Sequence, residues 1–296
     1  MLELFSPLPE VPGLLLRAVV ALGFTGAAAY FDMFNKKWVP NYLVYGFLAA
    51  ALVLNVIYFE QAVFTQAITF GIVIFALTYF LYKAGQLGGA DVYVLASIAM
   101  CLPYLPKPLL APAQNVPYPF LLSALAPAGL AFILHMVARF LPYVSRKLAA
   151  GEIKFTLWKA AGPAALLAVF SFFLFALSTL PIPLPAQFIA ILSFLFVSLF
   201  FFTLFKEEIK DSMVEQVLVS RLQEEDVLAL EKMDPALVKS LELAPLITKE
   251  TVASLKKSKL TRVPVYTGMP FFLPYLFLGL LFSVLFGDLL FYIISL

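Results

Sequence analysis

The chain has 296 residues, of which 62% are hydrophobic and only 13% are charged, and its mean hydropathy is +0.96. Soluble domains carry about 25% charged and about 45–50% apolar residues, so this composition excludes an ordinary soluble protein. The formal net charge is only +2, and we expect no nucleic-acid partner. A single cysteine, Cys101, excludes an internal disulfide or a paired-cysteine metal site, and a single histidine, His135, argues against a histidine-based metal centre.

The excess of apolar residues lies in runs of the length that crosses a bilayer. They predict about eight spans, the fourth of them short, at residues 13–31, 40–59, 63–82, 91–105, 119–138, 160–180, 185–205 and 268–295. We therefore expect an all-α integral membrane protein, a polytopic helical bundle embedded in the lipid bilayer of the cell membrane. The sequence leaves its oligomeric state open.

Basic residues predict the orientation of these spans. Lys36 and Lys37 follow the first span, Lys83 ends the third, and a basic link follows the fifth, with Arg139, Arg146, Lys147, Lys154 and Lys159. On the other face we find only Lys107, and Arg17 near the start of the first span. The positive-inside rule places the basic loops in the cytoplasm and both termini outside.

Residues 206–266 have a normal soluble composition, and the orientation makes them cytoplasmic. The sequence thus divides into a membrane-embedded core at 1–205, this small insert at 206–266, and a C-terminal transmembrane helix at 267–296. Within the insert, Val214, Val217, Leu218 and Leu222 recur at helical spacing, which predicts a helix. The stretch "PLITKETVASLKK" predicts a second, short helix opened by Thr248.

Two aspartates occur where predicted spans meet the same membrane face. Asp32 lies in "AYFDMFNKK", where the first span leaves the membrane, and Asp91 follows "GQLGGA", where the fourth enters. Following the chain in, out and in again places both at the cytoplasmic boundary. A carboxylate inside a membrane is expensive, which makes each of them a candidate functional residue. A third, Asp288, lies about 20 residues into the last span, so it should face the opposite side, about 30 Å away.

Two facing carboxylates cannot both ionise readily, so they tend to share a proton. One then acts as a general base towards water while the other polarises a carbonyl, as in aspartic proteases. Gly88 and Gly89 would let the backbone bend and a substrate strand approach closely. The simpler alternative is that each aspartate is a boundary residue or a helix cap.

The "GGAD" stretch at 88–91 resembles the GxGD signature of the archaeal type IV prepilin and preflagellin (archaellin) peptidases, which are membrane aspartic proteases. The first-aspartate motif of that family is similar to Asp32 with the following lysines and the Pro40–Asn41 pair. The tail at 262–289 also resembles the final span of long archaeal members. Ala90 replaces the second glycine of GxGD, and Tyr93 stands where many relatives have a lysine.

The resemblance implies an endopeptidase that removes short basic leaders (class III signal peptides) from pilin- or archaellin-like precursors at the cytoplasmic face. Asp32 and Asp91 would be catalytic, supported by motif residues Gly88, Gly89, Ala90, Pro40 and Asn41. Cleavage would use water and need no metal or other cofactor. Separately, the charge of residues 206–250, with 11 acidic and 6 basic side chains, would attract a basic leader; the alternative is an ordinary solvated face of a small structural domain.

Other classes of protein remain open. A transporter or channel could use paired aspartates for protons or cations, although such sites usually lie at the membrane midplane. A lipid-modifying enzyme would need more clustered aspartates for a divalent metal. A catalytically inactive relative is a further alternative, which Tyr93 keeps open.

Overall fold

The computed structural model describes residues 10–35, 38–114, 116, 118–153, 157–179, 185–222, 226–241, 243–257, 260–267 and 270–295. Lys36, Lys37 and Lys154, on which part of the predicted orientation depends, lie outside the described residues. The described chain forms two compact units, Met1–Ala128 with Met213–Asp288, and Gly129–Ser212 with Leu289–Leu296. We call them unit 1 and unit 2.

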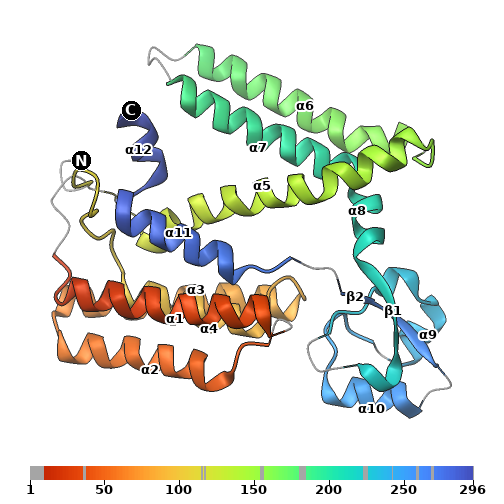
Figure 1. The fold of residues 1–296 in the computed structure, drawn as a ribbon, viewed down its shortest axis with the longest axis horizontal. Helices are drawn as coiled ribbons and strands as arrows, with labels where there is room; N and C mark the ends of the chain where they lie inside the picture. Colours follow the sequence, from red (N-terminus) through yellow and green to blue (C-terminus); the bar gives the residue numbers. More distant parts are fainter. Residues whose placement is uncertain are drawn as a thin grey trace. The chain divides into compact units, whose positions relative to one another are not determined.

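Apolar helices dominate both units (Figure 1). They are α1 (Leu14–Phe34), α2 (Asn41–Ile57), α3 (Gln61–Lys83), α4 (Gly89–Cys101), α5 (Phe120–Ala149), α6 (Leu157–Ser178), α7 (Ala186–Leu204), α11 (Leu273–Phe286) and α12 (Leu289–Ser295). In the described part of the chain, five helices are long and apolar enough to cross a membrane, and α2, α4 and α11 are shorter apolar helices. The protein is thus an all-α multi-pass membrane protein, and the total of eight spans stays a prediction.

The last predicted span is not one helix. Gly287 has φ +84° and, together with Asp288, separates α11 from α12. A positive φ is costly for residues other than glycine and interrupts the helical backbone. The prediction of a continuous helix at 268–295 was therefore wrong, because the chain breaks one residue before a buried aspartate. α5 is longer than the fifth predicted span at 119–138, because it continues to Ala149. Arg139, Arg146 and Lys147 therefore lie on the last turns of this helix and not in a link after it.

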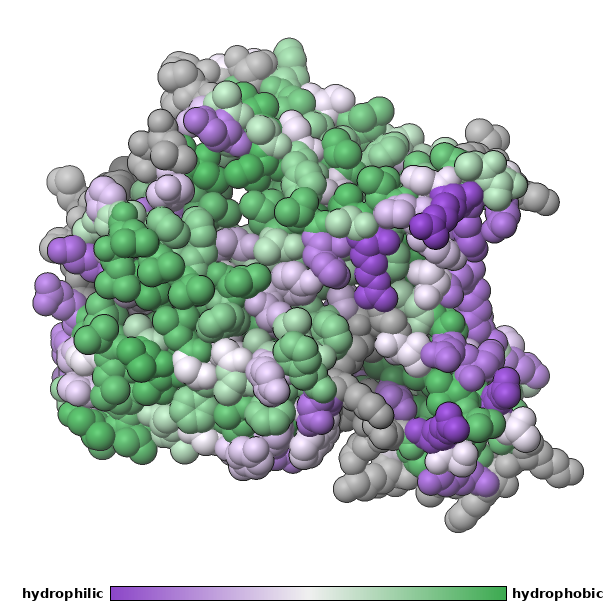
Figure 2. All heavy atoms as spheres, in the orientation of Figure 1, coloured by the Kyte–Doolittle hydropathy of each residue, from purple (hydrophilic) through white to green (hydrophobic). Residues whose placement is uncertain are grey.

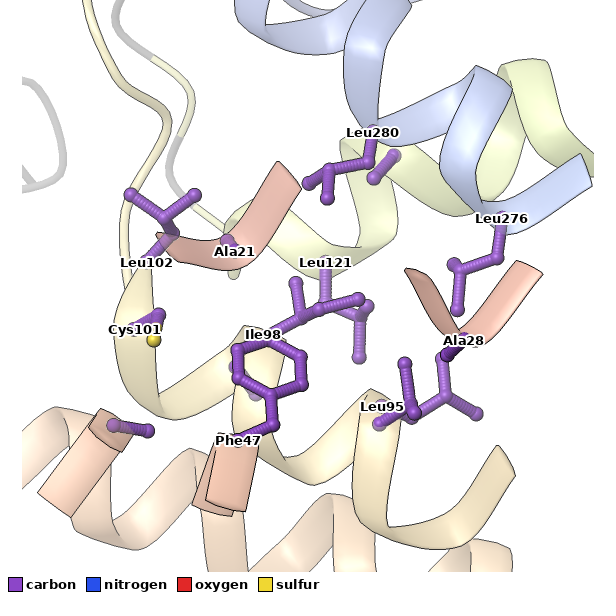
Figure 3. Close-up of a cluster of buried hydrophobic side chains, with 14 of the residues drawn as sticks. Ala21, Ala28, Phe47, Leu95, Ile98, Cys101, Leu102, Leu121, Leu276 and Leu280 are labelled. Atoms are coloured by element: carbon purple, nitrogen blue, oxygen red, sulfur yellow. The ribbon is translucent and has the colours of Figure 1, made fainter. Parts of the chain in front are cut away.

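Unit 1 is built around a tightly packed apolar core. α4 packs against α2 and α3, and α1 packs against α2, α4 and α11. Figure 3 shows the centre of this core, where Ile98 and Leu95 of α4, Phe47 of α2 and Leu121 of α5 gather with Ala21 and Ala28 of α1. Small residues on α1 let its neighbours approach closely, which is how helices pack in a membrane.

The predicted 206–266 insert has a small core of its own at residues 214–266, and we keep the name insert for this part. It contains α9 (Pro235–Ser240), α10 (Lys249–Lys257) and a sheet in which β1 (Val214–Leu218) pairs antiparallel with β2 (Arg262–Tyr266). α8 (Lys206–Met213) precedes it, and single turns of 3-10 helix follow β1 at Val219–Arg221 and lie at Leu230–Lys232. Figure 2 shows hydrophilic residues over the insert and apolar residues over the helices of unit 1. The predicted helix opened by Thr248 is confirmed, because the Thr251 backbone N–H donates to Thr248 Oγ1 at 3.3 Å.

The helix predicted from Val214, Val217, Leu218 and Leu222 was wrong. Val214–Leu218 is a strand whose pairing with β2 runs from Val214 opposite Tyr266 to Leu218 opposite Arg262. Valine is a strong strand former, and over so short a segment the apolar spacing fits a strand as well as a helix. Pairing with β2, 44 or more residues further along the chain, makes this segment a strand.

Unit 2 contains the hairpin of α6 and α7. Phe170 of α6 and Phe196 of α7 stack with ring centroids 3.8 Å apart. Lys159 of α6 forms an ion pair with Glu208 of α8. Phe172 and Phe175 of α6 are largely exposed, which suits a helix surrounded by lipid.

Candidate active site

Asp32 lies on the last turn of α1 and is only 8% exposed. Its Oδ2 accepts a hydrogen bond from the backbone N–H of Leu273 at 3.3 Å. Leu273 is the first residue of α11, so the carboxylate lies at the N-terminus of a helix that is 241 residues further along the chain. The positive end of a helix dipole favours a negative charge at this position.

Asp91 lies in the first turn of α4 and is also 8% exposed. Its Oδ2 accepts the backbone N–H of Gly88, the N-cap residue, at 2.9 Å. Asp91 therefore does cap its own helix, as the simpler alternative expected. A cap occupies one lone pair of a carboxylate that has about four acceptor sites, so capping is compatible with chemistry at the same group.

A buried arginine shows how α1 and α4 run relative to each other. Arg17, near the start of α1, donates to the carbonyl of Cys101, the last residue of α4, at 3.2 Å. The two helices are therefore antiparallel, with the start of α1 beside the end of α4. At 1.5 Å per residue, Asp32 lies about 22 Å from this junction and Asp91 about 15 Å from it, both in the same direction.

Core residues one helical turn away from each aspartate also indicate that α1 and α4 are antiparallel. Ala28 precedes Asp32 by four residues and Leu95 follows Asp91 by four, and the two lie next to each other in Figure 3 within one buried cluster. The structure thus brings the ends of α1 and α4 that carry Asp32 and Asp91 to the same end of unit 1. We call it the aspartate end.

The other motif residues form the turns around this end. Pro40 is the N-cap of α2 and Asn41 its first residue, so the pair fixes where the chain re-enters the bundle after α1. Gly88 has φ −74°, a conformation open to any residue, and Gly89 and Ala90 open α4. The glycine that needs its conformational freedom is Gly85, at φ +72°.

The turn before α4 also lies close to the insert. A Cβ placed on Gly85 would lie 3.7 Å from Pro245 Cβ and 3.8 Å from Val227 Cγ1, which is van der Waals contact. The insert therefore lies close to the turn that leads into Asp91, while its strand β2 leads towards α11 and Asp32. Nothing in the spacing of the sequence indicated this proximity.

Tyr93, where many relatives have a lysine, has a packing role. Its ring makes edge contacts with Tyr45 of α2 and Phe75 of α3, with centroid separations of 5.2 and 5.6 Å. Aromatic pairs of this geometry stabilise a packed interface. The residue thus joins three helices beside Asp91.

Asp288 lies in a different part of unit 1. It is 1% exposed, accepts a hydrogen bond from the Tyr118 hydroxyl at 2.6 Å, and donates its backbone N–H to Gln114 Oε1 at 2.7 Å. Burial and the bond to Asp288 raise the pKa of Tyr118, so this phenol stays protonated. The first residue of α11, Leu273, is bonded to Asp32, and the helix ends at Phe286, two residues before Asp288. The length of α11 therefore places the two carboxylates about 20 Å or more apart.

Within the described residues there is no group of three or more histidine, cysteine, aspartate or glutamate side chains that could hold a metal ion. At the aspartate end the structure has two buried carboxylates, each of which accepts a backbone N–H. Sequence reasoning found both carboxylates but missed the donor on Leu273, since a backbone N–H has no side-chain signature.

Packed apolar helices with two buried carboxylates at one end define a multi-pass membrane protein with a candidate hydrolytic site. Residues 19–134 match the model of the type IV leader peptidase family. The match covers this region of the chain and supports a peptidase of the leader-peptidase type in general. No curated protein and no solved structure matches the chain. The matched region holds Asp32, Pro40, Asn41 and the 88–91 turn, whereas the insert and α11 lie outside it.

Proposed function

We propose that this protein is a membrane-embedded aspartic endopeptidase that removes short basic leaders from pilin- or archaellin-like precursors. Asp32 and Asp91 are its catalytic pair, and the aspartate end faces the cytoplasm. One observation carries the proposal. Two buried carboxylates, 59 residues apart in sequence, lie at the same end of antiparallel helices inside the region that matches a leader peptidase family.

The reaction follows from the chemistry of a carboxylic acid and a carboxylate. The ionised aspartate removes a proton from water, and the protonated one donates a hydrogen bond to the scissile carbonyl, where negative charge develops. The protons come off such a pair in steps that belong to both groups together. The backbone donors of Gly88 and Leu273 hold each carboxylate from one side.

The membrane supplies the geometry of the substrate. A precursor with a short basic leader and an apolar helix inserts that helix into the bilayer, so the junction between them lies at the membrane surface. With the aspartate end in the cytoplasm, this junction and the two carboxylates share one depth. The basic leader stays outside the hydrocarbon, where a charged segment is not penalised.

The test compares three matched substitutions in the purified protein, reconstituted in liposomes. Precursors from a panel with class III leaders are incubated with the wild type, Asp32→Asn, Asp91→Asn and Asp288→Asn. Removing a general acid or base costs about 10²–10⁴-fold in rate, so the first two variants should lose cleavage. Asp288→Asn, also a buried aspartate but about 20 Å away, should retain most of it.

Folding of each variant is checked by gel filtration and thermal unfolding in detergent. Near wild-type cleavage by either Asp32→Asn or Asp91→Asn would overturn the assignment of the pair. Loss of activity in the Asp288 variant alone would move the site to the other end of unit 1.

A further inference from the structure

We propose that the N-terminus of α11 positions the catalytic carboxylate of Asp32 through the backbone N–H of Leu273. The C-terminal part of the chain, outside the family match, would then complete the active site. This inference rests on the proposed function, because it requires Asp32 to be catalytic.

The hydrogen bonds at the N-terminus of α11 leave one backbone donor for Asp32. The first N–H groups of any helix have no acceptor within the helix. Here the N–H groups of Tyr275 and Leu276 both donate to the Phe272 carbonyl at 3.1 Å. Pro274 has no N–H. The donor that remains in this first turn is Leu273, and it donates to Asp32 Oδ2. The sequence Phe272–Leu273–Pro274 thus directs a single helix-end donor to a single carboxylate.

The position of this donor is fixed by packing along α11. Leu273, Leu276 and Leu280 are at most 1% exposed and belong to the central core of unit 1. Ser283 Oγ donates to the Ser123 carbonyl at 2.9 Å. α11 also contacts α1 itself, where a Cβ on Gly26 would lie 3.1 Å from the Phe277 ring. Two helices held in this way cannot slide, so the Leu273 N–H stays at the level of Asp32.

The two aspartates are therefore held in the same manner from different sources. Gly88 supplies the N–H for Asp91 from three residues away, and Leu273 supplies the N–H for Asp32 from the far end of the chain. A hydrogen bond to an ionised group is about twice as strong as a neutral one and fixes its direction. Losing the Leu273 donor removes one of the contacts that set the direction of the Asp32 carboxylate.

The experiment replaces the Leu273 N–H by an ester. The ester also makes the Phe272 carbonyl a weaker acceptor, and a second ester at Tyr275, which removes one of the two hydrogen bonds to that carbonyl, controls for this loss. Nonsense suppression inserts the α-hydroxy acid of leucine at position 273, which replaces the N–H with an ester oxygen and keeps the buried side chain. We expect kcat to fall about tenfold or more while KM for the precursor changes little. A purely structural role would lower the yield of folded enzyme and leave kcat per folded molecule unchanged.

Two controls separate positioning from stability. The equivalent ester at Tyr275 removes a donor from the same turn that reaches Phe272 and not Asp32, so it should leave kcat unchanged. Val63→Ala truncates a fully buried side chain on α3, in a separate apolar cluster with Val11 and Tyr104, so it should lower the unfolding temperature without lowering kcat per folded molecule. A wild-type kcat in the Leu273 ester, or equal losses in both esters, would overturn the positioning role. If Asp32→Asn retains activity, the proposed function itself fails, which is a separate result.

Discussion

Gly279 lets α11 pack against the first turns of α5. A Cβ placed on this glycine would lie 2.2 Å from the carbonyl oxygen of Ala124, 2.6 Å from Ala128 Cβ and 2.7 Å from the Ala128 backbone nitrogen. Two of these atoms belong to the backbone of a helix and cannot rotate away. An added methyl group therefore requires the helices to separate by about 1 Å or more.

The Gly279→Ala variant should consequently be destabilised although alanine is the better helix former. Alanine contributes about 1 kcal/mol of helix propensity relative to glycine, and overpacking of a tight core costs about 3 kcal/mol when the backbone must move. The expected loss is about 2 kcal/mol in the free energy of unfolding. Separation of the helices also displaces the Leu273 N–H, so cleavage should slow.

Gly23→Ala and Gly129→Ala are matched controls, because a Cβ at either position would meet nothing within 4 Å. Reversible unfolding in mixed detergent micelles, followed by circular dichroism, measures all three variants. The two controls should be as stable as the wild type or slightly more stable. A Gly279→Ala protein that is as stable as Gly23→Ala would refute the close approach of α11 and α5.

Three further predictions test other parts of the molecule. Arg17 is fully buried and donates to four acceptors, so Arg17→Met should lower the free energy of unfolding by about 3 kcal/mol, whereas exposed Arg139→Met should leave it unchanged in the same unfolding assay. In a variant without the native cysteine, Ala150→Cys should react with an impermeant thiol reagent only from the cytoplasm and Ala113→Cys only from outside; the reverse would reject the proposed orientation. Neutralising the acids at 224–226 should raise KM for basic-leader precursors about fivefold at low salt with kcat unchanged, and an equal KM would leave the insert without a part in recruitment.

The helices of unit 1 were predictable because each is a separate run of apolar residues. The first four runs were expected at 13–31, 40–59, 63–82 and 91–105, and α1 to α4 lie within four residues of those limits. The bilayer requires every spanning backbone to satisfy its own hydrogen bonds, so a long apolar run has few alternatives to a helix. Prediction failed where this constraint is absent, at β1 in the insert and at the break before Asp288.

The candidate site was predictable in part for a related reason. Chain direction alternates with each span, so counting spans brought Asp32 and Asp91 to one end, where the structure has both. The count says nothing about rotation of a helix or about which backbone groups meet a side chain. The Leu273 donor, the Arg17 junction and the proximity of Gly85 to the insert all depend on packing between segments remote in sequence.

The structure also changes how the charge of the insert should be counted. The window at 206–250 is acidic, but its first three acids, Glu207, Glu208 and Asp211, belong to α8 in unit 2. The folded insert at 214–266 includes the basic residues after α10 and holds eight acidic and eight basic side chains. Attraction of a basic leader by net charge is therefore not available to it.

Only a local attraction, by individual acidic side chains of the insert, is still available for a basic leader. Asp226 directly precedes Val227, which lies close to the Gly85 turn that leads into Asp91. Glu224 and Glu225 lie outside the described residues. Screening limits the reach of these charges to about 8 Å at physiological salt. A leader would therefore be held only when it already lies beside the turn into Asp91, where the proposed mechanism places the scissile bond. Recruitment on this basis would act on the bound precursor and not on its approach, so added salt should raise KM while leaving the association rate almost unchanged.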